Sequence, residues 1–478
     1  MRKFVKLELL KLLKDFRLYV GAALLLPLLW YGFDVRHTAI LKSAAAVDTS
    51  RVHEKRQYAK YITLLDSVSN KGKTITEYYA DPRNPVFFSQ QAPQFAHLPV
   101  KALALLAHGQ SDLYNEEVLL SARFRDPRQQ RQDMQNPALL KFGQFDAAMV
   151  LVLLFPIYII ALSFNSLSGE KEMGTLRLVA VQTGNVKKWL WAKAILYGFT
   201  CFVVAWIICL ILLAAYGVRF GEEAGSILLF SFALLAYTAL WQLLTLSVNL
   251  YGRSSAFNAL VLVSLWIVFA FILPGLSNLT ANEIYKVPSR VSFINALRLA
   301  GVEAEKLDSS QLINQYYFDH PELADKKESP GSNRFSANDY WKEIVMNQEI
   351  VNKKVDPLYN EYNEKLKQAN RFAGYAGFAS PASIFNTALL QLAGVSSKDY
   401  FDFSDAAMKY RAVFLADIRD RILTDKEITY PEVIQRVKFS YRSPGNSRIL
   451  PQLLALALYS MILFAWIARR LEKFSGSL

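Results

Sequence analysis

Long apolar runs alternate with long polar segments along the chain. Six of these runs approach or exceed the ~20 residues that a helix needs to cross a ~30 Å hydrocarbon core. The polar segments after the first and fifth runs are long enough to fold as domains. The pattern predicts an all-α membrane protein with six transmembrane helices and two large, mainly helical extracytoplasmic domains. The predicted spans are residues 18–33, 147–167, 190–216, 226–250, 256–276 and 449–468.

The segment ahead of the first run has its own periodicity. Residues 1–17 place apolar side chains at Phe4, Leu9 and Leu13 with lysines between them. This pattern predicts a basic amphipathic helix on the inner leaflet, either a topology anchor or a strut against a cytoplasmic partner. A secretory signal peptide is the alternative, because a basic stretch precedes a short apolar run. The long periodic stretch, and the lack of a small-residue cleavage site after Phe33, favour a retained helix.

Basic residues gather at particular places relative to the apolar runs. The chain has 54 Lys and Arg against 41 Asp and Glu, a net charge of +13. The basic residues concentrate before the first run, in the 168–189 loop and in the 469–478 tail. Segments rich in Lys and Arg beside a span stay in the cytoplasm. Both termini are then cytoplasmic, and residues 34–146 and 277–448 lie on the far side. Because topology accounts for the charge, nucleic acid is not an expected partner.

The chain has two cysteines, Cys201 and Cys209, and both lie in the third predicted span. Neither large polar segment can therefore hold a disulfide. This distribution favours a bacterial envelope over a strongly oxidising extracellular setting. We expect both thiols to pack as small apolar groups, and we expect the protein in the bacterial cytoplasmic membrane.

The sequence contains start and stop signals of helices within the polar segments. Ser380-Pro381 before an apolar run that ends at Gly394 is a start and a stop signal for one helix. Ser404 is expected to open another. Residues 340–372 have helical spacing that Pro357 interrupts, and Pro99 to Gly109 reads as a short helix. Residues 124–138 and 320–338 read as loops.

Motifs for catalysis or ligand binding are weak throughout the sequence. Gly72-Lys73-Thr74 has the tail of a phosphate-binding loop, but Ser67 stands where that loop needs glycine. None of the five histidines has a zinc-site spacing, and the spans hold almost no ionisable side chains for intramembrane chemistry. We expect neither an enzyme nor a cofactor bound by this chain, and no charged ring or filter sequence suggests a channel.

Uncharged polar residues lie inside the predicted spans, toward their cytoplasmic halves. Such side chains commonly form hydrogen bonds between helices, and lining a substrate path is the other interpretation. Pro156 and Pro274 are expected to kink the second and fifth spans. The polar residues singled out are Asn165, Gln242, Asn249 and Asn258.

The polar stretch after the second span carries the clearest local pattern. The helix is expected to continue to about Glu172 and to end at Gly174. Thr175 can start a second short helix, and Asn185 can cap the helix that leads into the third span. The product is a short helix on the membrane surface between two hinges. It can transmit force to two spans, or it can be an ordinary surface hairpin.

This stretch resembles the coupling region of ABC-2-type transporter permeases. The matching residues are Glu170, Gly174, Thr175 and Leu176, in the right place among six spans. Residues 181–184, Val-Gln-Thr-Gly, depart from the usual second half of that region. A wider set of residues matches the subgroup of these permeases that has large outer insertions and contains domain of unknown function 3526. Those matches are residues 136–140, 143–146, 380–382 and 392–394.

The resemblance implies a function and a set of partners. It implies the transmembrane permease subunit of an exporter, with ATP and Mg²⁺ bound by a separate ABC ATPase chain and with a second permease, identical or related. It also implies that Glu170 and Glu172 offer carboxylates to a basic rim of the ATPase. The substrate would be an unknown envelope component, and periplasmic proteins are further candidate partners beside the lipid bilayer. A scaffold or a sensor without transport is the alternative. The expected ATPase-coupling residues are Glu170, Glu172, Gly174, Thr175, Leu176 and Arg177.

Overall fold

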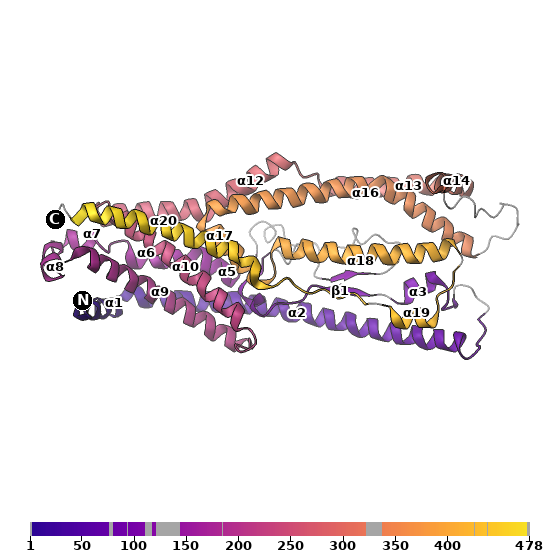
Figure 1. The fold of residues 1–478 in the computed structure, drawn as a ribbon, viewed down its shortest axis with the longest axis horizontal. Coiled ribbons are helices and arrows are strands. Elements are labelled where there is room, and N and C mark those ends of the chain that lie inside the picture. Colours follow the sequence, from indigo (N-terminus) through magenta and orange to yellow (C-terminus); the bar gives the residue numbers. More distant parts are fainter. Residues whose placement is uncertain are drawn as a thin grey trace.

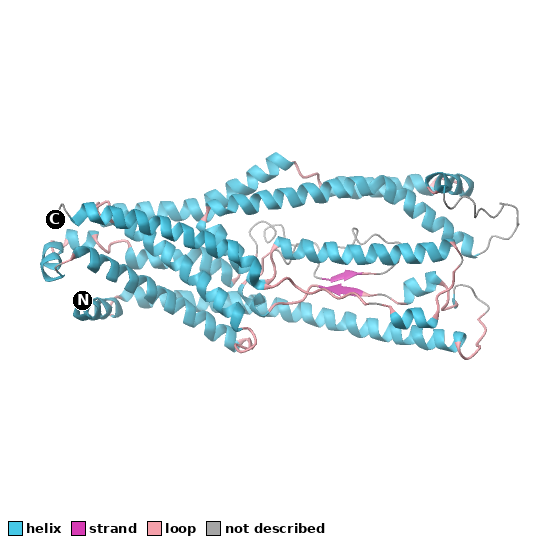
Figure 2. Ribbon diagram, in the orientation of Figure 1, coloured by secondary structure: helices cyan, strands magenta, loops and turns pink. Residues whose placement is uncertain are grey.

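The protein is almost entirely helical, and the predicted fold class is confirmed (Figure 2). The computed structural model describes residues 2–75, 80–92, 94–109, 117–120, 144–183, 185–321, 337–424, 426–436 and 438–475. The resembling residues 136–140 and 143, the loop 124–138, most of the loop 320–338 and Gly184 lie outside the described residues.

Six helical segments are long and apolar enough to cross a membrane. They form a bundle at one end of an elongated molecule, and both chain termini lie at the tip of that bundle (Figure 1). We call this tip the terminal end and the opposite end of the bundle the domain end. In chain order, the six segments are α2 (Phe16–Ser69), Ala147–Glu172, α9 (Val186–Ala215), α10 (Ala224–Asn249), Ser255–Tyr285 and Asn446–Glu472.

Three of these segments consist of several elements. The second contains α5 (Ala147–Met149), the π-helical turn η4 (Val150–Leu154), α6 (Phe155–Ser163) and α7 (Ser168–Glu172). The fifth contains α11 (Ser255–Ile267), the π-helical turn η5 (Val268–Ile272) and α12 (Leu273–Tyr285). The sixth contains η7 (Asn446–Ile449) and α20 (Leu450–Ser475). The flanking short helices of the bundle are α1 (Arg2–Leu13) and α8 (Leu176–Thr183).

The first spanning helix is much longer than the 18–33 run that the sequence indicates. α2 has 54 residues and leaves the bundle as one continuous helix. Residues 34–69 contain neither glycine nor proline, so nothing in them stops helix propagation. The outer part of α2 is therefore a strut of the domain beyond the bundle.

The two long polar segments build this domain, which we call the extramembrane domain. β1 pairs antiparallel with β2 in the register Phe95 to Leu119. α16 runs through Pro357 without a break, and α18 begins at Ser397 rather than Ser404. Its elements are the outer part of α2, α3 (Pro85–Gln91), β1 (Phe95–His97), η2 (Ala102–Leu106), β2 (Glu117–Leu119), α13 (Arg290–Glu305), α14 (Ser309–Asp319), α16 (Ala337–Ala376), η6 (Gly377–Ala379), α18 (Ser397–Leu423) and α19 (Tyr430–Gln435). α17 (Pro381–Ala393), from the second of these polar segments, packs in the hydrophobic cluster of the spans instead.

The two polar segments contribute side chains to common hydrophobic clusters. At the end far from the bundle, Tyr61 and Phe88 from the first segment pack with Phe414 and Ile418 from the second. The Phe88 and Phe414 rings meet edge to face with centroids 6.0 Å apart. The Arg436 guanidinium lies 3.6 Å from the centre of the Phe414 ring. Segments more than 300 positions apart in sequence thus stabilise each other.

We expect Phe414→Ala to loosen this end of the extramembrane domain. The change removes a buried ring from the shared cluster, which costs about 3–5 kcal/mol at typical core sites. Hydrogen exchange of the α18 amides measures the local opening free energy. Val413→Ala is the control, because Val413 is 72% exposed beside it and should change that free energy by less than ~0.5 kcal/mol. Equal effects of the two changes would contradict the assigned packing.

Candidate functional site

The stretch between the second and third spans contains two short helices and two turns. Gly174, the residue expected to end the first helix, has a φ of 69°. A side chain is disfavoured in that left-handed conformation. Thr175 N–H donates to the Glu170 carbonyl at 3.0 Å, and α8 follows at Leu176. The Asn185 side chain accepts from the Lys188 N–H and caps α9. The chain therefore turns at Gly174 before α8, and Asn185 caps the next helix after it.

Glu170 lies at the centre of a charge cluster that is buried except for Lys11, whose side chain is 62% exposed. The Glu170 side chain is 7% exposed, and its Oε1 is 3.6 Å from both Lys193 Nζ of α9 and Lys11 Nζ of α1. Thr175 donates its hydroxyl to Oε2 at 2.5 Å. Lys193 also donates to the Ser166 carbonyl at 3.0 Å. The Glu170 carboxylate is therefore largely buried and already has partners within the chain, and the expectation that it meets an ATPase stays a prediction.

The same cluster holds α1 against the bundle. Trp189 Nε1 donates to Glu8 Oε1 at 3.3 Å, and both side chains are buried. Lys193 Nζ lies 5.0 Å from the centre of the Trp189 ring. Leu12 of α1 is buried as well, whereas Leu7 and the other exposed leucines of α1 face outward. α1 thus binds α9 through one face and leaves apolar and lysine side chains on another.

Glu172 is exposed but also has partners within the chain. Its carboxylate accepts from the Ser255 N–H at 2.6 Å and from the Ser255 hydroxyl at 2.8 Å. Ser255 is the first residue of α11, so Glu172 holds the start of the fifth span. Lys171 Nζ donates to the Gly252 carbonyl at 2.8 Å next to it. The end of the second span and the start of the fifth are therefore joined through polar contacts.

Two buried asparagines bind the second span where its helix is interrupted. Helical structure stops at Ser163 and resumes at Ser168, although the sequence predicts a continuous helix to Glu172. Asn249 Oδ1 accepts from the Leu167 N–H at 3.2 Å and from Asn258 Nδ2 at 3.3 Å. Asn249 Nδ2 donates to the Ser163 carbonyl at 3.3 Å. The amide groups thus satisfy backbone groups that the interruption frees.

Gln242 and Asn165 also form contacts between helices. Gln242 Oε1 accepts from the Ser163 hydroxyl at 3.0 Å, and Asn165 Oδ1 accepts from Arg17 Nη1 at 3.5 Å. Arg17 also donates to the Ala161 carbonyl at 3.0 Å. Its hydrogen bonds with Asp15 hold the pKa of the Asp15 carboxyl below its ordinary value. The four polar residues singled out in the sequence therefore all take part in interhelical hydrogen bonding.

The exposed face of α8 is apolar. Leu176 is buried against Trp189 and Leu246, whereas Leu178 and Val181 on the opposite face are exposed. Val181 is 81% exposed, and Met173 lies open just before the helix. We call Met173, Leu178 and Val181 the α8 face. The sequence analysis did not identify this face. The pattern that indicates it is the three-residue spacing of Leu178 and Val181, on the side of the helix opposite to Leu176.

In the described part of the chain, no group of three or more His, Cys, Asp or Glu side chains is placed to hold a metal ion. Cys201 and Cys209 are buried in α9. What the geometry provides is a short helix with an open apolar face, tied through polar contacts to several spans.

We expect Glu170→Gln to destabilise the protein by about 1–3 kcal/mol, because the change removes one of the two carboxylates, Glu8 and Glu170, that stabilise the buried Lys193 ammonium. Thermal unfolding of the detergent-purified protein measures the loss. Glu222→Gln is the matched control, since the Glu222 side chain is 70% exposed in a surface pair with Arg219 and such pairs contribute ~1 kcal/mol or less. If both variants melt like the unmodified protein, the buried cluster does not have this role.

Comparison with known families covers most of the chain. Residues 290–442 match a domain of unknown function, DUF3526. Residues 51–298 match the family described as ABC-2 family transporter protein. No curated protein and no solved structure matches the chain. Because the second match spans more than half of the 478 residues, the chain belongs to the ABC-2 transporter family and is a multi-pass membrane permease that carries a DUF3526 domain.

Proposed function

We propose that this permease is the membrane subunit of an ABC-2 exporter in the bacterial cytoplasmic membrane. A separate ABC ATPase chain would bind ATP and Mg²⁺, and the permease would couple hydrolysis to movement of an unknown envelope substrate. The observation that carries the proposal is the α8 face, an open apolar surface on a helix that is fixed to the spans. The family match supports the same assignment.

Charge supports an orientation with the terminal end in the cytoplasm. The lysines of α1, the basic residues of 168–189 and the basic residues after the last span all belong to this end of the bundle. Positive charge near span ends is retained on the cytoplasmic side. The extramembrane domain would then stand in the periplasm, where it could meet envelope proteins or the substrate.

The α8 face has the character of a protein-binding surface. Met173, Leu178 and Val181 are exposed together beyond the ends of the spans. Buried apolar anchors carry most of the binding energy at protein interfaces, and Arg177 beside them adds a charged rim. In this proposal the ATPase binds the apolar face of α8, while Glu172 contributes only at the margin.

A push on α8 would reach several spans at once. α7 extends from the second span, and Glu172 joins it to the start of the fifth. Asn185 caps α9 directly after α8, and Glu170 connects Lys11 of α1 with Lys193 of the third span. Because these contacts are short and mostly polar, we expect the spans to move as rigid bodies. A second permease chain, identical or related, would complete the transporter.

A transporter needs a binding surface for an ATPase at α8, whereas the rival functions do not. A membrane scaffold or a sensor would use the extramembrane domain for periplasmic partners and would have no need of an ATPase. Co-purification from cells therefore separates the proposals. An ABC ATPase bound to the permease supports transport, whereas envelope proteins alone would support a scaffold.

We expect Val181→Asp to weaken ATPase binding by at least about 30-fold. A charge placed in an apolar anchor position removes a contact of about 2 kcal/mol or more, which corresponds to that factor. Quantitative pull-down of the co-expressed ATPase measures the change.

Val413→Asp is the control, since it places the same charge at an equally open valine of the extramembrane domain. It should leave ATPase binding unchanged. Binding that survives Val181→Asp as well would remove α8 as the contact.

A further inference from the structure

Arg36 and His108 form a buried contact between the first span and the first polar segment. Arg36 lies in α2 just beyond the apolar run 18–33, and His108 follows η2; the two residues are 4% and 2% exposed. Arg36 Nη1 lies 3.2 Å from His108 Nδ1, and Arg36 Nε donates to the Ala104 carbonyl of η2 at 3.1 Å. One guanidinium therefore holds η2 and the residues after it against α2.

Asp146 fastens the same residues to the second span. Its carboxylate accepts from the His108 N–H at 2.7 Å and from the Met149 N–H at 2.7 Å, so it also caps α5. The first two spans touch at Gly32, where a Cβ would lie 2.6 Å from the Ala147 nitrogen. The residues after η2 are thus clamped by two spans that pack directly against each other.

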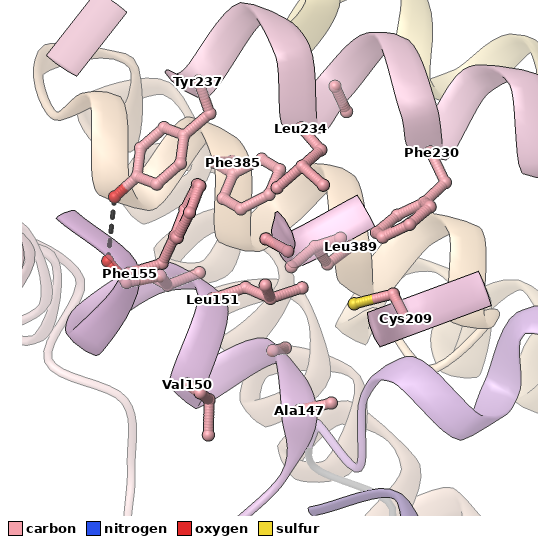
Figure 3. Packing of buried hydrophobic residues seen from close by; sticks show 14 of the residues in the cluster. Ala147, Val150, Leu151, Phe155, Cys209, Phe230, Leu234, Tyr237, Phe385 and Leu389 are labelled. Carbon is pink, nitrogen blue, oxygen red and sulfur yellow. Dashed lines mark hydrogen bonds between the residues drawn. The ribbon is translucent and has the colours of Figure 1, made fainter. Parts of the chain in front are cut away.

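These polar contacts lie next to the hydrophobic cluster of the bundle. Ala147 and Leu151 of the second span are fully buried in that cluster, and Leu106 of η2 belongs to it as well. Figure 3 shows Leu151 close to Leu389 of α17. Because apolar side chains shield this region from water, the polar groups within it depend on one another for hydrogen bonds.

The contact determines the protonation state of the His108 ring. A guanidinium has only N–H donors, so His108 Nδ1 is the acceptor and carries no hydrogen. The imidazole is therefore neutral, with its hydrogen on Nε2. A second proton would sit on Nδ1, facing the N–H of a cation 3.2 Å away. Since both groups are buried, little water would screen the repulsion between the two positive charges.

The charged groups near this ring come from a few elements. The elements that pack most closely on η2 are α2, α5 and α17. The start of α5 contributes Asp146, and α17 contains no titratable side chain. Asp34 and His37 of α2 contact Tyr216 at the end of α9 instead. Lys101, ahead of η2, donates to a carbonyl of α17. Among these groups, the guanidinium is the one in contact with the imidazole.

Acid acts on Asp146 in the opposite sense. Burial raises the pKa of its carboxyl, and the N–H groups of His108 and Met149 offset this in part. A carboxyl with a raised pKa binds its proton more readily in the folded protein, so its protonation favours the folded junction as the pH falls. Loosening in mild acid would therefore arise from His108, because histidine is the side chain that gains charge in that range.

We propose that the contact between Arg36 and His108 is an acid-sensitive latch, which holds the extramembrane domain on the first two spans while the imidazole is neutral and opens when the ring gains a proton. The latch goes beyond the proposed export function and does not depend on an ATPase. In the proposed orientation it lies on the side away from the cytoplasm, so acid outside the cell would open it. The extramembrane domain would then move more freely relative to the spans.

Hydrogen exchange of the full-length permease in detergent tests the latch. Protection factors of the amides of residues 104–109, corrected for the effect of pH on intrinsic exchange, are compared at about pH 7.5 and about pH 5.5. We expect them to fall at least about tenfold in acid, as the loss of a buried hydrogen bond to a charged group implies, while the amides of α10 keep theirs. Unchanged protection of residues 104–109, or an equal fall in α10, would overturn the latch.

Variants on both sides of the contact separate His108 from other effects of acid. His108→Gln keeps an acceptor for the guanidinium but does not titrate, and Arg36→Gln keeps a donor for the imidazole but has no charge. Each should reduce the acid effect on residues 104–109 to less than about twofold. His53→Gln is the matched control, because His53 is an exposed histidine of the same helix, and it should retain the full effect. An acid effect that persists in both contact variants would overturn the latch.

Right-side-out vesicles separate the latch from the proposed orientation. Acid applied only outside should lower the protection of residues 104–109 as much as acid on both sides. If only acid inside the vesicles lowers it, the proposed orientation of the exporter fails and the latch stands. If acid on neither side lowers it, the latch fails whether or not an ATPase binds the permease.

Discussion

Backbone groups inside an apolar bundle need partners from the protein itself, and this constraint shapes the whole molecule. At several interruptions of the spanning helices, a side chain from another element binds the backbone. Tyr237 binds the Val152 carbonyl, Ser380 binds the Phe269 carbonyl, and Asn249 binds the interrupted stretch after Ser163. Since bilayer lipids offer no hydrogen bonds, these interruptions also decide where neighbouring elements must lie.

Charge follows the same logic at the terminal end. A buried carboxylate is tolerated only when cations and donors surround it, and Glu170 has Lys11, Lys193 and Thr175. The result is a rigid base from which α8 projects its apolar face. At both ends of the bundle, polar contacts fix a helix that also contacts a part beyond the spans. At one end that part is the extramembrane domain, and at the other end it is, in our proposal, the ATPase.

Sequence patterns were informative where local signals decide the structure. Run length predicted six spans, Gly174 and Asn185 predicted the turns around α8, and Ser380, Pro381 and Gly394 predicted the ends of α17. Tertiary contacts decided the rest. Glu170 looked like an exposed charge because the lysine of α1 that meets it is more than 150 positions away. α17 looked like part of a water-exposed domain because its 13 residues are too few to cross a membrane.

Cross-linking at the α8 face tests the account's central claim most directly. A photoreactive amino acid is placed at position 181 or at position 172 in cells that express the permease with its ATPase. The account predicts an adduct of the permease with the ATPase from position 181 and far less from 172, where the native carboxylate faces Ser255. An adduct from position 172 without one from 181, or no ATPase adduct at either position, would contradict it.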